Sequence, residues 1–161
     1  MDQREIRNIA GTFATGVTVI TTREANGKPV GMTANSFTSL SLNPPLVLFS
    51  IDKNASLYET FMNTKYFAIN ILSEDQEDLS RQFSKRNIDR FEDVSYEKGV
   101  TGTPILNDTI GYFDCAVHTY YDGGDHTIVV GEIKNGEARE GNPLLFYRGK
   151  YNKVAEYLIK Q

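Results

Sequence analysis

The sequence predicts a mainly β protein, an antiparallel β-barrel with short helices packed against its outside. Two turn signals carry this prediction, Asn26-Gly27 and Asp122-Gly123-Gly124, and each lies between two runs rich in β-branched and aromatic residues. Strands also fail to alternate regularly with helices, which argues against a doubly wound parallel sheet. With 161 residues, 40% of them hydrophobic and 24% charged, residues 1–161 are expected to form a single globular domain.

The first third of the chain is expected to hold one helix and three strands. A short amphipathic helix opens it, because four apolar residues fall at helical spacing: Ile6, Ile9, Ala10 and Phe13. Residues 15–22 and 29–36 then form the two strands of the first hairpin. Residues 46–51 are predicted as a central strand that follows Asn43-Pro44-Pro45, because a proline cannot donate a hydrogen bond within a ladder.

Two short helices are predicted on either side of a strand at residues 66–72. Ser56 with Glu59, and Ser73 with Gln76, have the spacing of a capping box, in which two side chains bond to the first turn of a helix. The sequence therefore places a helix start at each serine.

The last part of the chain is expected to return to β-structure. Residues 85–107 are irregular and charged, as in loops that form lids or contact partners. Residues 110–121 and 126–134 form the second hairpin, residues 143–151 the last strand, and residues 154–158 a short closing helix.

Bulk properties exclude several classes of partner. The net charge of −4 argues against nucleic acid, and no apolar run approaches the ~20 residues that cross a membrane. The charged N-terminus is not expected to be a signal peptide. The single cysteine, Cys115, cannot form an internal disulfide, so the cytoplasm is the expected location and a buried, inert thiol the expected state.

Short polar side chains are concentrated between residues 33 and 41, just before the apolar strand at 46–51. A flat heterocycle such as flavin needs hydrogen-bonding groups along its edge and an apolar wall against its faces, which is the usual lining of a ligand pocket. Residues 32–36 can supply the edge and residues 47–51 the wall. The alternative is that these hydroxyls are ordinary strand residues.

A phosphate site is predicted where that strand leads into a helix. Lys53, Asn54 and Ser56 are placed to donate hydrogen bonds to an anion there. The alternative is that Ser56 only caps its own helix. His126 follows the second glycine turn, where it is either a reactive residue or a structural one.

Other familiar sites are not found in the sequence. It has no glycine-rich dinucleotide motif after a strand, no phosphate loop, no Cys or His spacing typical of zinc, and no nucleophile elbow.

Five stretches, taken in order, resemble the flavin reductase-like family with the split-barrel FMN-binding fold, the reductase components of two-component flavin monooxygenases. They are FATGVTVITT (13–22), GMTANSFTSLSLNPPLVLFSID (31–52), YFAINILSEDQEDLSRQFS (66–84), GDHT (124–127) and PLLFYRGKY (143–151). The resemblance covers nearly the whole chain.

This resemblance implies a homodimeric Greek-key barrel that binds FMN or FAD and uses NADH or NADPH. Hydride would pass from the nicotinamide to the flavin, and the reduced flavin would go to a partner monooxygenase or another acceptor. The implied flavin-binding residues are Thr33, Ala34, Asn35 and Ser36 at the ring and ribityl chain, Ser50 and Ile51 at the strand end, Asn54 and Ser56 at the phosphate, and Phe83 and Tyr147 beside the pocket. His126 would face the nicotinamide as the catalytic residue.

Two other functions remain open from the sequence. One is a non-catalytic FMN-binding protein, a sensor or carrier with the same barrel, and the other is a structural barrel without a cofactor. The choice between FMN and FAD, the choice between NADH and NADPH, the electron acceptor, and whether the flavin stays bound or exchanges are not predicted.

Overall fold

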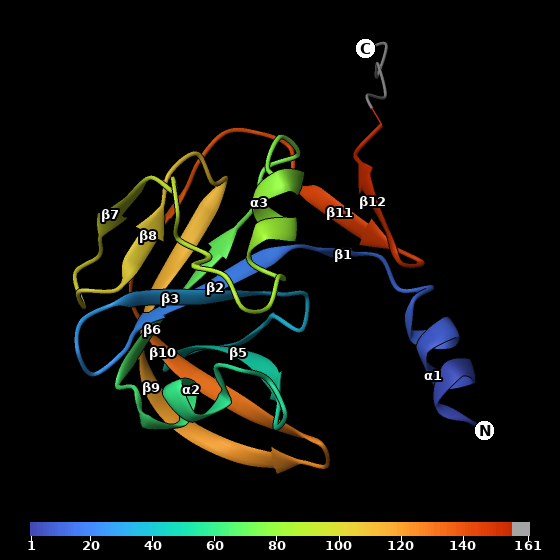
Figure 1. The fold of residues 1–161 in the computed structure, drawn as a ribbon, viewed down its shortest axis with the longest axis horizontal. Helices are drawn as coiled ribbons and strands as arrows, with labels where there is room; N and C mark the ends of the chain where they lie inside the picture. The colour runs from blue at the N-terminus through green and yellow to red at the C-terminus, as the bar shows by residue number, and fades with distance from the viewer. Residues whose placement is uncertain (156–161) are drawn as a thin grey trace.

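The computed structural model describes residues 1–155 and confirms the mainly β, split-barrel prediction (Figure 1). Seven antiparallel strands form one curled sheet in the order β3-β2-β6-β9-β10-β5-β4. The elements are α1 (Gln3–Ala10), β1 (Thr15–Gly16), β2 (Thr18–Arg23), β3 (Pro29–Ala34), β4 (Thr38–Leu42), β5 (Pro45–Asp52), α2 (Tyr58–Asn63), β6 (Tyr66–Ile71), α3 (Glu77–Gln82), β7 (Tyr96–Lys98), β8 (Pro104–Leu106), β9 (Gly111–Gly123), β10 (His126–Ala138), β11 (Leu144–Tyr147) and β12 (Lys150–Lys153).

Both predicted hairpins are present. The Asn26-Gly27 turn joins β2 to β3, and Gly27 has a φ of +87°, a conformation that favours glycine. The second hairpin joins β9 to β10, with Gly124 at a φ of +77° in its tip. A third hairpin, β4–β5, lies at the far edge of the sheet, so the chain crosses the barrel between β3 and β4. Strand β6 then returns to pair with both β2 and β9, which completes the sheet.

The barrel core follows from the two-residue period of β5. Val47, Phe49 and Ile51 are fully or almost fully buried, whereas the residues between them are partly exposed. The Phe49 ring meets the rings of Phe61 and Phe67 edge to face, with centroids 5.5 and 5.1 Å apart. Phe61 is the buried residue of α2, so this contact holds α2 against the barrel.

A second apolar cluster lies beneath α3. Phe83, at the end of that helix, is fully buried and meets Phe91 edge to face at 5.0 Å. Leu72 and Leu144 are buried in the same cluster, so it joins the helix to the start of β11. The segment between Ser84 and Phe91 is therefore held against the barrel at both ends.

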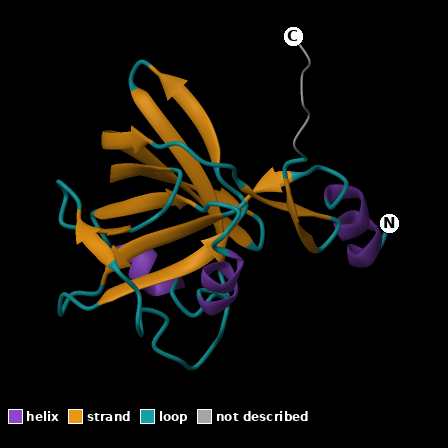
Figure 2. Ribbon diagram, turned by 90° about the horizontal axis from the view of Figure 1, so that it is seen from above, coloured by secondary structure: helices purple, strands orange, loops and turns teal. Residues whose placement is uncertain are grey.

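Helix α1 and the small β1–β11–β12 sheet form an arm that protrudes from the barrel (Figure 2). The predicted amphipathic helix is confirmed, and Asp2 and Glu5 form its capping box. None of the residues of α1 is buried, and Ile6, Ile9 and Phe13 are 51, 59 and 78% exposed.

Both helices begin later than the serines at which the sequence places their starts, α2 by two residues and α3 by four. Helix α2 begins at Tyr58, and its cap residue Leu57 makes no side-chain bond. Asp52 accepts the N–H of Asn54 in a separate turn before this helix. Helix α3 begins at Glu77. The side chain of Gln76 accepts the N–H of Ser73 at 2.9 Å, so this pair closes the turn before the helix.

Three strand predictions also need correction. Residues 143–151 form part of a hairpin, because the chain reverses at Arg148 and Gly149, which have φ values of 48° and 75°. Residues 85–107 contain the short β7–β8 hairpin, and residues 38–42 form β4. Of the closing helix predicted at residues 154–158, residues 156–158 lie outside the described residues, and residues 154–155 are not helical.

Within residues 1–155, no helix is long and apolar enough to span a membrane. The same part of the chain holds no cluster of three or more side chains suited to a metal ion.

Cys115 is fully buried, and burial together with the nearby charge of Asp114 raises the pKa of its thiol to about 12. Because thiolate is the reactive form, we expect an aromatic disulfide reagent at pH 8 to leave the native thiol unmodified. The same reagent should label one thiol per chain in urea. Rapid labelling of the native protein would contradict this assignment.

Candidate functional site

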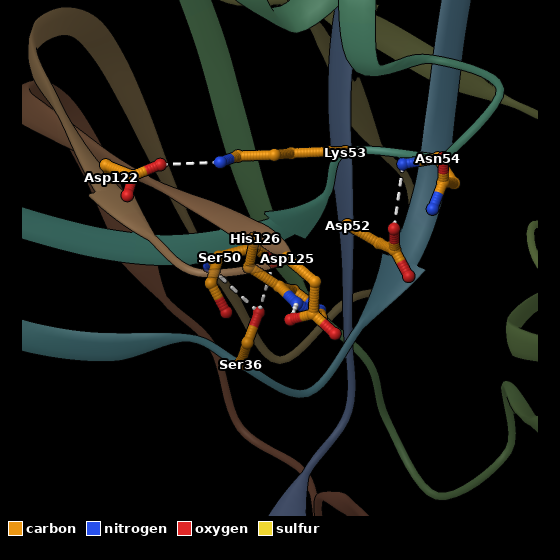
Figure 3. Close-up of polar contacts among 8 residues, drawn as sticks. All are labelled: Ser36, Ser50, Asp52, Lys53, Asn54, Asp122, Asp125 and His126. Atoms are coloured by element: carbon orange, nitrogen blue, oxygen red, sulfur yellow. Dashed lines mark hydrogen bonds and ion pairs between the residues drawn. The ribbon is translucent and has the colours of Figure 1, made fainter.

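Several predicted site residues meet at one end of the seven-stranded sheet. There β5 ends, the β9–β10 hairpin turns, and the segment after β3 crosses toward β4 (Figure 3). Ser36, Ser50 and His126 lie together at this end, although they come from three parts of the sequence.

The crossing segment is fixed by one hydroxyl group. Ser36 Oγ donates to the carbonyl of Ser50 at 2.8 Å and accepts the N–H of Ser50 at 3.1 Å. The two bonds satisfy the backbone N–H and C=O of Ser50, which has no partner in the edge strand β4 because β4 pairs with β5 only as far as Leu48. Ser36 therefore replaces a strand partner and sets the path of the backbone from Asn35 to Phe37.

The register of β5 against β10 decides which side chains face this end of the site. His126 pairs with Asp52, and Ile128 pairs with Ser50. Paired residues share one face of a sheet, so Ser50 and His126 lie on the same face. Ile51 lies on the other face and is fully buried in the core, so only its backbone is available to a ligand.

The turn before His126 is held by polar contacts. His126 Nδ1 lies 2.7 Å from Asp125 Oδ1, and this hydrogen bond and the charge of the imidazole lower the pKa of the Asp125 carboxyl. The His126 side chain is 41% exposed, so its ring is open to solvent. A carboxylate on Nδ1 sets the orientation of the imidazole and leaves Nε2 to face outward.

A cavity of about 180 Å³ lies beside the end of β3. It is lined by Val17, Thr33, Ala34, Asn35, Ser84, Phe146 and Tyr151. The hydroxyl of Thr33 donates to Ser80 O at 2.6 Å, and its N–H donates to Phe83 O at 3.2 Å. Thr33 is thus held by α3, and Asn35 is the exposed polar group at the rim.

The apolar wall of this cavity differs from the predicted one. We expected residues 47–51 to supply the wall, but Phe146 and Tyr151 of the β11–β12 hairpin do so. Their rings meet edge to face at 5.4 Å. The residues Val47, Phe49 and Ile51 face the core instead.

A second cavity, of about 170 Å³, contains Ser56. It lies between the start of β3, the start of α2, and residues 87–91. Arg90 in this segment donates to Gly31 O at 2.9 Å and to Lys85 O at 2.6 Å. Burial, and then the charge of Arg86, lower the pKa of Arg90, which still carries a full positive charge at neutral pH. The cavity therefore combines a hydroxyl and a fixed cation.

Three predicted residues are placed differently from expectation. Phe83 is fully buried against Phe91 and Gly31, so it supports β3 from behind and does not present a ring face. Tyr147 lies in the arm, 39% exposed, with its hydroxyl accepting from Arg148. Lys53 Nζ pairs with Asp122 at 2.5 Å, so its side chain points away from that of Asn54 (Figure 3).

Two larger clefts, each of about 550 Å³, lie around Arg23 and Thr64. Their lining includes none of the predicted site residues. Arg23 donates to Gly102 O and Gly27 O, and the Thr22 and Thr64 hydroxyls bond to one another and to Tyr66 O. The smaller cavities along β3 contain the predicted residues Thr33, Ala34, Asn35 and Ser56, which makes them the better candidate site.

Comparison with known proteins identifies the family of the chain. The "Flavin reductase like domain" family model matches residues 10–155. The chain is 43% identical over 148 residues to the reductase component of the flavin-dependent trigonelline monooxygenase of Acinetobacter baylyi, covering 92% of this chain. This chain spans about half the length (48%) of that relative. It also spans 48% of a probable flavin reductase of Rhizobium meliloti.

Two further similarities cover most of both proteins. The chain is 43% identical to the FMN reductase (NADH) SmoA of Agrobacterium fabrum, over 96% of this chain and 87% of that one. Among solved structures, the NADH:FAD oxidoreductase of Streptomyces globisporus in complex with NAD and FAD fragments has a TM-score of 0.89 and 38% identity, over 96% and 93% of the two chains.

The bonds of Ser36 predict a measurable contribution to stability. Ser36→Ala removes a partner from both backbone groups of Ser50, so we expect the free energy of unfolding to fall by about 1–2 kcal/mol. Urea unfolding measures this change. Ser39→Ala, on the exposed strand β4, is the matched control and should change it by less than about 0.5 kcal/mol. Equal effects of the two variants would refute the role of Ser36.

Proposed function

The chain belongs to the family of flavin reductase like domains, and we propose that it is an NAD(P)H:flavin oxidoreductase, an enzyme that transfers hydride from NADH or NADPH to FMN or FAD. The observation that carries this proposal is the placement of the partly exposed His126 on the face and at the strand end where Ser36 and Ser50 lie. A binding protein for flavin alone needs no reactive side chain beside an open ring face.

The residues along β3 fit the chemistry of a flavin. The cavity at Thr33, Ala34 and Asn35 has polar groups at its rim and two aromatic rings in its wall, as a flat ring with a hydrogen-bonding edge requires. The cavity at Ser56 and Arg90 offers a hydroxyl and a cation for a phosphate. Ser50, Asn54 and the backbone of Ile51 lie at the strand end between the turn and the helix and are proposed as additional contacts.

A flavin held here would supply the hydride acceptor and a nicotinamide the hydride donor, so the protein must mainly bind and orient the two cofactors. In our proposal, backbone groups between Thr33 and Ser36 hold the ring edge, and donors there stabilise developing negative charge. His126 contacts the nicotinamide, with its ring orientation set by Asp125. This division of roles explains why the site needs no acid–base pair near the hydride.

We further propose that reduced flavin passes to a partner monooxygenase. The name of the Acinetobacter baylyi relative, a monooxygenase reductase component, supports this partner class. Residues 1–161 are proposed to act as a single flavin reductase-like domain in the cytoplasm, where the nicotinamide cofactors are abundant and a buried free cysteine such as Cys115 stays reduced.

A homodimer is proposed from the exposed arm. Ile6 and Ile9 of α1, a helix without a buried residue, and Phe13 in the loop that follows it present apolar surface. Exposed apolar surface that is grouped on one face commonly marks a protein interface, and a second copy of the chain is the simplest partner for it.

The proposed activity is tested by mixing the purified protein anaerobically with NADH and FMN and following the loss of flavin absorbance. Bleaching far above the protein-free control supports the reductase, and repeats with NADPH and FAD set its specificity. Quenched flavin fluorescence without bleaching would support a carrier or sensor. A protein that neither bleaches nor quenches flavin would be a barrel without this cofactor.

His126→Ala should weaken the use of nicotinamide far more than the binding of flavin. The expected result is a rise in the KM for NADH of at least about tenfold, with the flavin Kd changed less than about twofold. His118→Ala is the matched control, because His118 is the other histidine of the chain and is exposed on β9. Equal losses of both affinities in His126→Ala would remove His126 from the nicotinamide site.

Ser56→Ala should lower the affinity for FMN without lowering stability. Among the described residues the Ser56 hydroxyl does not cap α2, whose cap residue Leu57 makes no side-chain bond, so a cap loss of ~1 kcal/mol is not expected. Riboflavin, which lacks the phosphate, should bind wild type and variant equally. Fluorescence titration and thermal melting measure the two quantities, and an unchanged FMN affinity would place the phosphate elsewhere.

Ile9→Glu should dissociate the proposed dimer. A carboxylate at the centre of the apolar face of α1 is costly to bury, so we expect the mass measured by light scattering to halve. Asn8→Glu, on the opposite side of α1, introduces the same charge as a control and should keep the wild-type mass. A monomeric wild-type protein would refute the dimer.

A further inference from the structure

The tip of the β9–β10 hairpin reaches past the end of its neighbour β5. Strand β5 ends at Asp52, opposite His126, and the turn residues Gly124 and Asp125 extend beyond that pair. A two-stranded tip without a further strand beside it is weakly supported. The position of His126 therefore depends on whatever holds this tip.

Lys53 contacts the tip at two points. Its backbone N–H donates to Asp125 O at 2.9 Å, and its Nζ pairs with Asp122 Oδ1 at 2.5 Å (Figure 3). The two contacts lie on either side of the glycine turn. The Lys53 and Asp122 side chains are 38 and 79% exposed, so the ion pair adds little to global stability, and its effect is on local geometry.

The contacts continue from the tip to the imidazole. Asp125 receives the Lys53 N–H on its carbonyl and bonds His126 Nδ1 through its carboxylate. Lys53 also follows directly after Asp52, which accepts the N–H of Asn54. Lys53 thus connects the turn that leads to Ser56 with the turn that orients His126.

We propose that Lys53 is a positioning residue, which fixes the Asp125–His126 turn relative to Ser36 and Ser50 at the end of β5. By fixing the position of His126 in this way, Lys53 sets the affinity for the nicotinamide. This inference rests on the proposed function. Lys53 acts through the tip and does not contact the flavin phosphate, although its place in the sequence favours the phosphate role.

The decisive variant is Lys53→Met, which keeps the length of the side chain and removes the charge. We expect the KM for NADH to rise roughly threefold to fivefold, the scale of an exposed ion pair, with kcat and the flavin Kd unchanged. Asp122→Asn should reproduce this rise, and the double variant should add nothing to it, because both substitutions break one contact. Lys53→Arg should restore most of the affinity.

The matched control is Lys134→Met. Lys134 forms a comparable exposed ion pair with Glu132 on the same strand β10, with its Nζ 2.8 Å from the carboxylate. It lies far along the strand from the tip, so the KM for NADH should not change. A similar rise in Lys134→Met would show a general charge effect on NADH binding and would overturn the proposal.

A measurement independent of turnover separates this inference from the proposed function. The NMR signals of the His126 ring should shift in Lys53→Met and stay unchanged in Lys134→Met, and the chain has only one other histidine to assign. Unchanged His126 signals would overturn the positioning role even in an active reductase. An inactive wild-type protein with shifted signals would overturn the function and leave Lys53 as the support of the tip. A loss of FMN affinity in Lys53→Met equal to or larger than the change in KM would make Lys53 a flavin ligand.

Discussion

The register between β5 and β10 is the constraint on which the candidate site depends. It pairs Asp52 with His126 and continues without a shift to Leu46 opposite Glu132. A slip of one residue would turn Phe49 and Ile51 out of the core and carry Ser50 into it. The aromatic contacts of Phe49 in the core therefore fix the place of polar groups on the opposite face.

Most polar groups of the site hold the backbone before they meet any ligand. Ser36 bonds to both backbone groups of Ser50, and Thr33 bonds to α3. Such groups give a preformed lining, which lowers the ordering cost of binding. A reaction carried by two cofactors needs this rigidity more than it needs a nucleophile or a proton relay.

Local signals in the sequence predict local structure well here. The Asn26-Gly27 and Gly123-Gly124 turns identify two hairpins because glycine reaches positive φ at no steric cost. Three residues of the predicted site segment, Thr33, Ala34 and Asn35, line a cavity. The fourth, Ser36, bonds to Ser50 at the end of the sheet. Arg90 and the wall of Phe146 and Tyr151 were missed, because they reach the site from irregular or distant segments that only tertiary contacts bring there. The helix starts were predicted too early because a short turn precedes each helix: Asp52 accepts the N–H of Asn54 before α2, and Gln76 accepts the N–H of Ser73 before α3.

The aromatic wall of the cavity belongs to the arm, which has few buried residues. Leu144 anchors the root of the β11–β12 hairpin in the second cluster, and Tyr151 bonds Ser80 of α3 at 2.6 Å. Segments with few buried contacts open locally at a lower free energy than the barrel around them. A ring bound against Phe146 and Tyr151 would stabilise the docked β11–β12 hairpin by mass action. Occupancy of the cavity and protection of residues 144–153 from exchange or proteolysis are thereby thermodynamically linked.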